Sequence, residues 1–235
     1  RRMKSEVLRE LPPKTENVRR VELETEQRKL YLAAVVDARE KLRAAKPEDK
    51  MTVFAVLMRL REICCDPRLV ADNWTGSSAK LEACLELVTE AVAGGHRILL
   101  FSQFTSMLEL LAKRLDEAGV SHFTLQGSTP KPVRAELVRR FNSGEADVFL
   151  ISLRAGGTGL NLTAADIVIH YDPWWNVAAQ NQATDRAYRI GQRNPVQVYK
   201  LIAQDTIEEK IVELQQAKQD LCLLYTSDAA DEEDS

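Results

Sequence analysis

The sequence has little of what marks secreted, metal-binding or membrane proteins. Only four of its 235 residues are cysteine, and no two of them form a CxxC pair. His96, His122 and His170 lie far apart, so the spacing of a metal site is missing. No apolar run approaches the ~18 residues that a membrane span needs, and the basic amino terminus is not followed by a signal-peptide core. We expect reduced thiols in a core, no bound metal and no membrane partner.

Two further motifs are missing. The chain has no GxxxxGK[ST] loop, the usual cradle for nucleotide phosphates. We therefore expect that the chain alone does not hydrolyse a nucleoside triphosphate. It also has no run of basic residues typical of nuclear targeting, which favours the bacterial cytoplasm or nucleoid over a nucleus.

The charge is unevenly distributed. The net charge is −3, but residues 227–235 (SDAADEEDS) hold five acidic side chains and no basic one. Without this segment the chain is close to neutral, so composition neither demands nor excludes a nucleic-acid partner. With 45% hydrophobic and 29% charged residues, the sequence is typical of a globular domain with one sizeable core.

The order of apolar patterns predicts an α/β fold. Helical spacing of apolar residues predicts helices over 24–45, 51–63 and 79–93. After residue 95, short apolar runs predict strands over 98–102, 122–126, 147–152, 166–171 and 196–202. Helices are predicted between and after them, over 104–118, 131–142, 176–188 and 206–221. This alternation predicts a mainly parallel sheet covered on both faces, with ligands beyond the carboxyl ends of its strands.

Two segments that follow predicted strands carry polar side chains. Ser102 and Gln103 stand at a helix start, where hydroxyls and backbone N–H groups can hold phosphate, although a plain helix cap has the same residues. Gly127 and Ser128 stand in the next such turn (LQGSTP) and allow the same two interpretations.

The segment ISLRAGGTGLNLTAADIVIHYDPWWN (151–176) follows a buried strand. Its glycines can bring the backbone close to a ligand and expose N–H groups to phosphate; a turn required only for packing is the alternative. The paired Trp174 and Trp175 are typical of core anchors, but an aromatic at a strand end can also stack on a base or sugar.

Arg186 and Arg189 lie three residues apart on a predicted helix and so share one face. Two adjacent guanidiniums repel each other unless an anion lies near them. A polyphosphate meets that need, and arginines that reach a transferring γ-phosphate are the finger mechanism. A surface ion pair between Asp185 and Arg189 is the alternative.

Taken in order, ILLFSQF, LQGSTP, ISLRAGGTGLNLTAADIVIHYDPWWN and QATDRAYRIGQ resemble the fourth to sixth motifs of SWI/SNF-like members of helicase superfamily II. LRELPPKTE and LMRLREICCDPRLV resemble that family's lead-in to its second lobe, and VYKLIAQDTIEEKI resembles the bracing helix that follows. The resemblance covers roughly residues 8 to 220. It departs at Val177, where the family has proline, at Tyr188, where histidine is common, and over residues 221–235.

The resemblance implies the second motor lobe of an ATP-driven double-stranded DNA translocase. It implies a RecA-like three-layer lobe over 76–203, a helical lead-in over 1–75, a bracing helix over 204–222 and an unassigned acidic tail over 223–235. The implied partners are a first RecA-like lobe, duplex DNA and ATP with Mg²⁺, which the first lobe would chiefly bind. A DNA-bound protein complex stays open as a further partner.

The resemblance also implies residue roles. Arg186 and Arg189 would be the arginine fingers. Residues bordering the nucleotide would be Gly159, Asn161, Gln182 and Asp185. Residues facing DNA would be Ser102, Gln103, Gly127, Ser128, Arg154, Ala155 and Gly156. Trp175 would couple DNA contact to lobe closure.

Three other functions remain open. The second lobe of an RNA helicase is disfavoured because DRAYRIGQ lacks that group's glycines around the arginines. A non-catalytic module that binds nucleic acid or protein is compatible with the missing first lobe. A doubly wound domain with an unrelated ligand leaves the paired arginines and tryptophans unexplained.

Overall fold

The computed structural model describes residues 11–46, 49–155 and 159–218. Six strands form one sheet in the order β1-β6-β5-β2-β4-β3, and each neighbouring pair is parallel. The strands are β1 (Lys14–Val21), β2 (Ile98–Ser102), β3 (His122–Leu125), β4 (Val148–Ser152), β5 (Ile167–His170) and β6 (Val196–Ala203). The predicted parallel sheet is confirmed.

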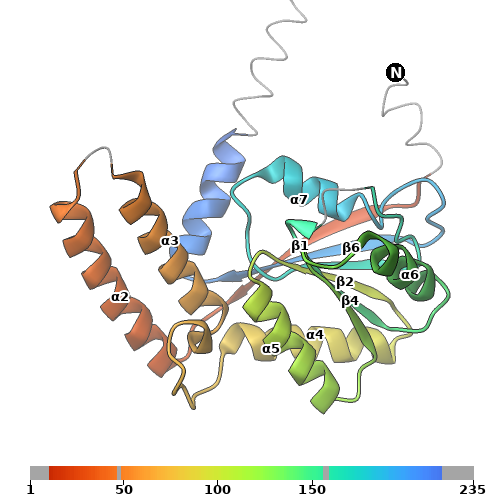
Figure 1. Ribbon diagram of the computed structural model, residues 1–235, viewed down its shortest axis with the longest axis horizontal. Helices are drawn as coiled ribbons and strands as arrows, with labels where there is room; N and C mark the ends of the chain where they lie inside the picture. Colours follow the sequence, from red (N-terminus) through yellow and green to blue (C-terminus); the bar gives the residue numbers. More distant parts are fainter. Residues whose placement is uncertain (1–10, 47–48, 156–158, 219–235) are drawn as a thin grey trace, which may run out of the picture.

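Helices cover both faces of this sheet (Figure 1). They are α4 (Ala79–Ala93), α5 (Thr105–Glu117), α6 (Lys131–Asn142) and α7 (Val177–Thr184). Successive side chains of a strand point to opposite faces, so Ile98 and Leu100 of β2 join the core beneath α4 and α5. Leu99 and Phe101 join the core beneath α6 and α7. The predicted three layers are thus present.

The lead-in contributes a helical hairpin, α2 (Thr25–Ala44) and α3 (Lys50–Cys65), followed by the short 3₁₀ helix η2 (Pro67–Leu69). The hairpin lies to one side of the sheet in Figure 1. A third core joins it to the lobe through residues such as Tyr31, Ile63 and Ala203. Here the buried Gln27 donates a 2.9 Å hydrogen bond to the Ile63 carbonyl.

Strand β1 is an element that the predicted helical lead-in did not include. Its residues (KTENVRRV) pair with β6 over the full length of both strands. Ion pairs support it, including Glu16 with Lys200 at 2.7 Å and Arg19 with Glu86. Because β1 is a largely exposed edge strand, it carries charges instead of the apolar run that strand prediction relies on. The division of the chain at residues 75 and 203 stays a prediction.

Helix α7 is shorter than predicted, which moves the two arginines off it. Asn176 caps its start by accepting hydrogen bonds from the Ala178 and Ala179 amides. The helix ends at Thr184, and Arg186 and Arg189 lie in the turns that follow. The Arg186 carbonyl accepts a hydrogen bond from the Leu162 amide at 3.0 Å, so contacts with the neighbouring loop replace further helical turns.

The bracing helix is present over residues 207–218. The Thr206 hydroxyl accepts a hydrogen bond from the Glu208 amide, and the Tyr31 hydroxyl accepts one from the Ile207 amide at 2.8 Å. The remainder of the predicted helix, Cys222 and the acidic tail lie outside the described residues. Cys64, Cys65 and Cys84 are buried free thiols, as predicted.

None of the helices in the described part of the chain is both long and apolar enough to span a bilayer. The same part of the chain holds no group of three His, Cys, Asp or Glu side chains that could bind a metal ion.

Candidate functional site

A cavity of about 720 Å³ lies beside the turns that follow α7. Its lining residues are Leu11, Lys14, Gly159, Leu160, Gln182, Asp185, Arg186, Tyr188, Arg189 and Ile190. These include both predicted fingers and all but one of the residues predicted to border a nucleotide. Lys14 begins β1, and the turns lead into β6, so the cavity lies at the amino ends of these strands. We call it the arginine cavity.

Positive charge is concentrated in the arginine cavity. Arg186 is only 5% exposed, whereas Arg189 is exposed and donates a 3.4 Å hydrogen bond to the Leu160 carbonyl. Burial lowers the pKa of Arg186, and the nearby charges of Arg134 and Arg189 lower it further. Guanidiniums placed this close favour an anion between or beyond them. Both arginines therefore lie at one site with Gly159, which belongs to the segment 151–176, here called the glycine segment.

Gln192 fixes the arginine-bearing turn to that segment. Its side-chain amide donates hydrogen bonds to the carbonyls of Thr163 (3.3 Å), Ala165 (2.7 Å) and Ala187 (3.1 Å). Because Gln192 is buried, these bonds hold Ala187, and hence the turn between the two arginines, in place. Sequence reasoning gave Gln192 no role; its position at the end of RIGQ was the available signal.

Lys14 is another cavity residue that sequence reasoning did not assign. Its ammonium lies 3.0 Å from the Glu16 carboxylate and 5.5 Å from the centre of the Tyr188 ring. It reaches the cavity because β1 joins the sheet beside β6, which the sequence did not predict. The motif LPPK was the only signal for it.

Asn161 does not line the arginine cavity. It is exposed, and its backbone carbonyl accepts a 2.8 Å hydrogen bond from the Asn142 side chain at the end of α6. Gly156, predicted to face DNA, lies outside the described residues.

A second cavity, of about 300 Å³, lies at the carboxyl ends of β2, β3 and β4. Its lining residues are Gln103, Thr105, Gln126, Gly127, Ser128, Ser152 and Arg154. Four residues predicted to face DNA, namely Gln103, Gly127, Ser128 and Arg154, thus meet there from three separate turns. We call it the strand-end cavity.

Two glycines near these cavities have room for a side chain among the described residues. A Cβ added to Gly127 or Gly159 meets nothing within 4 Å among those residues, and Gly127 does not have a positive φ. Close approach of a ligand to the backbone is one physical reason for glycine at each position.

Ser102 and Ala155, both predicted to bind DNA, expose little surface, and their DNA contacts stay a prediction. Ser102 is fully buried, and its hydroxyl donates a 2.6 Å hydrogen bond to Asp172. Ala155 is 3% exposed; its amide donates to the Ser152 hydroxyl, and its carbonyl accepts from Arg134 at 2.9 Å. Both residues support the cavity wall from inside, because their polar groups are already bonded within the protein.

The paired tryptophans have different surroundings. The backbone of Trp174 accepts a hydrogen bond from Gln215 and donates one to Gln180, which ties the loop to the bracing helix and α7. Both rings are partly exposed, and the Trp175 ring centre lies 5.6 Å from the Arg61 guanidinium carbon. Trp174 therefore anchors the loop through its backbone, while Trp175 packs against Arg61.

Two family descriptions match this chain. Residues 1–69 match the SNF2-related domain, and residues 79–191 match the helicase conserved C-terminal domain. The chain belongs to the SWI/SNF-like helicases.

Curated relatives agree with this family. A putative ATP-dependent helicase/translocase, YwqA of Bacillus subtilis, is 42% identical over 92% of this chain. An uncharacterized ATP-dependent helicase of Mycoplasma pneumoniae is 40% identical over 94% of it. This SWI/SNF-like chain spans only 24% and 22% of the two relatives' lengths.

Solved structures agree on the fold. The Sulfolobus solfataricus SWI2/SNF2 ATPase C-terminal domain is 29% identical with a TM-score of 0.74, covering 88% of this chain and 86% of its own. The same organism's SWI2/SNF2 ATPase core in complex with dsDNA is 31% identical with a TM-score of 0.78, covering 93% of this chain and 47% of its own. The RecA-like second lobe expected for a SWI/SNF-like helicase is thereby confirmed.

Proposed function

We propose that this chain acts as the second motor lobe of an ATP-dependent double-stranded DNA translocase. The observation that carries the proposal is the convergence of Arg186, Arg189 and the glycine segment on one cationic cavity. A first RecA-like lobe would close over this cavity and bring the nucleotide that it binds. Names of the relatives support ATP as that nucleotide.

The cavity lining suits a triphosphate. Arg189, exposed and three residues beyond Arg186, would reach the γ-phosphate and stabilise the charge that develops in the transition state. Gln182 and Asp185 would order the turn at the cleft, and Gly159 would let the backbone approach. Asn161 would border the nucleotide only after the loop moves. Mg²⁺ would be held by the acidic pair of the first lobe.

The strand-end cavity would contact one DNA backbone. Arg154 would pair with a phosphate, while Ser128 and the backbone at Gly127 would donate hydrogen bonds. The Sulfolobus core solved with dsDNA supports duplex DNA as the ligand. Binding would depend steeply on salt and little on base sequence, because phosphate contacts carry no sequence information.

The test uses the longer protein that carries both lobes. Its ATP hydrolysis is expected to rise with duplex DNA and to respond little to RNA. This chain alone, purified as residues 1–235, is expected to show no hydrolysis. Stimulation by RNA alone would favour an RNA helicase lobe, and hydrolysis by the isolated chain would contradict the proposed division of labour between the lobes.

A further inference from the structure

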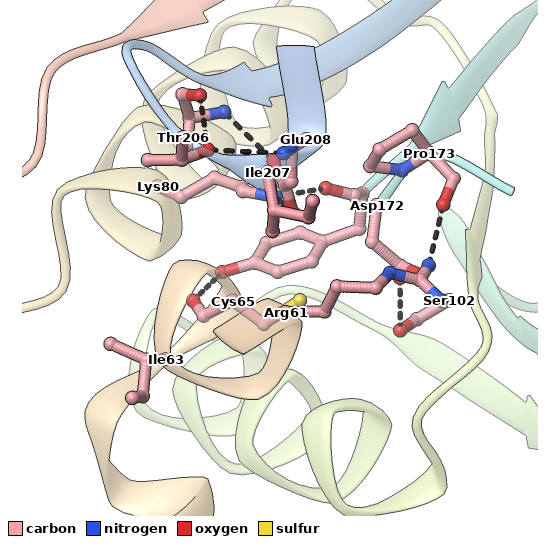
Figure 2. Close-up of polar contacts among 12 residues, drawn as sticks. Arg61, Ile63, Cys65, Lys80, Ser102, Asp172, Pro173, Thr206, Ile207 and Glu208 are labelled. Atoms are coloured by element: carbon pink, nitrogen blue, oxygen red, sulfur yellow. Dashed lines mark hydrogen bonds and ion pairs between the residues drawn. The ribbon is translucent and has the colours of Figure 1, made fainter. Parts of the chain in front are cut away.

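Two buried ion pairs lie near the carboxyl end of β5 (Figure 2). Arg61 of α3 lies 3.4 Å from the carboxylate of Asp172, and Lys80 of α4 lies 2.5 Å from that of Glu208. None of the four side chains is more than 1% exposed. Burying an ion pair costs much of what it contributes, so stability alone is a weak reason to keep one.

The guanidinium of Arg61 is buried with only part of its hydrogen-bonding capacity used among the described residues. Its Nη2 also donates a 2.5 Å hydrogen bond to the Pro173 carbonyl, and its guanidinium lies 5.6 Å from the ring centres of both Phe104 and Trp175. Its Nε and Nη1 have no hydrogen-bond partner among the described residues. Because an unsatisfied buried donor is unfavourable, an apolar side chain would fill this space more cheaply.

Asp172 connects Arg61 to a residue that lines the strand-end cavity. One carboxylate oxygen accepts hydrogen bonds from the Ser102 hydroxyl at 2.6 Å and from the Gln103 amide at 3.2 Å. Burial raises the pKa of Asp172, and the charge of Arg61 and the bond from Ser102 oppose that rise. Gln103 in turn lines the cavity together with Arg154.

The other ion pair makes different contacts. Lys80 donates hydrogen bonds to the Tyr171 carbonyl and to Glu208, which also accepts one from the Ala203 amide. These contacts join α4 to the start of the bracing helix. Neither Lys80 nor Glu208 lines either cavity. The two ion pairs are thus equally buried, but the Arg61–Asp172 pair is the one that is hydrogen-bonded to a lining residue of the strand-end cavity.

We propose that Arg61 is a positioning residue for DNA contact. It contacts the Trp175 ring directly and reaches the Gln103 amide through Asp172, and so fixes both residues relative to α3. Since α3 lies within the residues that match the SNF2-related domain, a displacement of the lead-in would move Trp175 and Gln103. This inference rests on the proposed DNA contact of the strand-end cavity.

The test compares matched amide substitutions in the two ion pairs. Asp172→Asn and Glu208→Gln each replace a buried carboxylate by an amide of the same shape and place an NH₂ group against a cation, so similar losses of thermal stability are expected. Duplex DNA binding by the 235-residue chain is measured by fluorescence anisotropy at a temperature where circular dichroism shows each variant folded. Asp172→Asn and Arg61→Lys are expected to weaken binding on the order of tenfold, and Glu208→Gln by less than about twofold.

Three outcomes overturn the positioning role. Asp172→Asn and Arg61→Lys bind as the unaltered chain does, Glu208→Gln weakens binding equally, or Arg61→Lys leaves the tryptophan fluorescence unchanged in a Trp74→Phe, Trp174→Phe background, where Trp175 is the remaining tryptophan. If neither main variant folds, Ser102→Ala replaces them; it removes one donor to Asp172, and a loss of about threefold is expected. Arg154→Ala separates the two proposals. Unchanged binding in Arg154→Ala, or no binding by the unaltered chain, contradicts the DNA face itself and the inference with it.

Discussion

The arginine cavity and the strand-end cavity differ in how they present charge. In the first, Lys14, Arg186 and Arg189 converge on one space. Among the described residues that line the second, Arg154 alone is charged, and it lies beside glycine, hydroxyl and amide groups. A triphosphate concentrates its charge at one point, whereas a DNA backbone spreads its charge along the strand. The difference in charge suits one cavity to each of these ligands.

The two cavities also lie at opposite ends of strands, and one loop connects them. The loop leaves the carboxyl end of β4 at Arg154 and reaches the arginine cavity at Gly159 and Leu160. The rule that ligands bind beyond carboxyl ends therefore finds only one of the cavities.

The largest expected effect is a loss of ATP hydrolysis, without a loss of DNA binding, when the arginine cavity is altered. In the two-lobe protein, Arg189→Ala should lower DNA-stimulated ATP hydrolysis on the order of 10³–10⁵-fold, because charge on the γ-phosphate loses its partner. Duplex DNA affinity should be unchanged. Arg193→Ala is the control, since Arg193 is exposed nearby but does not line the cavity. Near-normal turnover in Arg189→Ala would contradict the assignment of ATP hydrolysis to the arginine cavity.

The next effect concerns salt dependence at the strand-end cavity. Arg154→Ala should weaken duplex DNA binding and reduce the slope of log affinity against log salt by about one. The measurement is a salt titration followed by anisotropy. Arg139→Ala on α6 provides a matched loss of charge outside both cavities. Equal slopes for the two variants would show that Arg154 makes no specific phosphate contact.

Two glycine substitutions should separate the cavities without unfolding the protein. Gly127→Ala and Gly159→Ala should each change the free energy of unfolding by less than about 1 kcal/mol, because a Cβ at either position meets no described residue within 4 Å. Gly127→Ala should weaken DNA binding, and Gly159→Ala should slow ATP hydrolysis in the two-lobe protein. Chemical denaturation and the two activity assays check this; a large loss of stability would restore a packing role for the glycine.

The smallest effect is an acid-side change beside the arginine cavity. Burial tends to raise the pKa of Glu16, but hydrogen bonds and charge from Lys200 and Lys14 outweigh it and lower the pKa to about 2, from 4.5. The ionised carboxylate therefore stabilises the fold above pH 4.5, and that contribution is lost as pH falls from 4.5 to 2. Glu16→Gln should flatten this part of the stability profile by less than about 1 kcal/mol, since the pair is partly exposed. DNA binding should not change, and a steeper acid profile would contradict the assignment.

Elements with strong local patterns could be predicted from the sequence. The span of β2 was predicted because its five residues are apolar or small, and the structure shows all five buried. Helices α4 and α6 were predicted from the spacing of their apolar residues and from the serine, proline and glycine residues at their ends. The arginines and the glycine segment were found because they stand in long, specific motifs. These features are encoded within short stretches of chain.

The features that were missed depend on partners distant in the sequence. Strand β1 is identifiable only from its pairing with β6. Helix α7 ends early because the Arg186 carbonyl accepts a hydrogen bond from the Leu162 amide of a distant loop. Ser102 is turned inward by Asp172, seventy positions along the chain. Gln192 and Arg61 become informative only when their buried bonding partners are known. No periodicity in the sequence could have revealed these contacts.

The lead-in strand changes where this lobe can be cut. A fragment that begins at residue 76, the predicted lobe boundary, would lack β1 and leave the backbone N–H and C=O groups along one side of β6 unpaired. Since β6 (VQVYKLIA) is mostly apolar and carries one charged residue, Lys200, that side would offer an open template to other chains. Backbone pairing with β1 closes this template and places the charged side chains of β1 at the edge of the sheet, so the first strand protects the isolated lobe against aggregation.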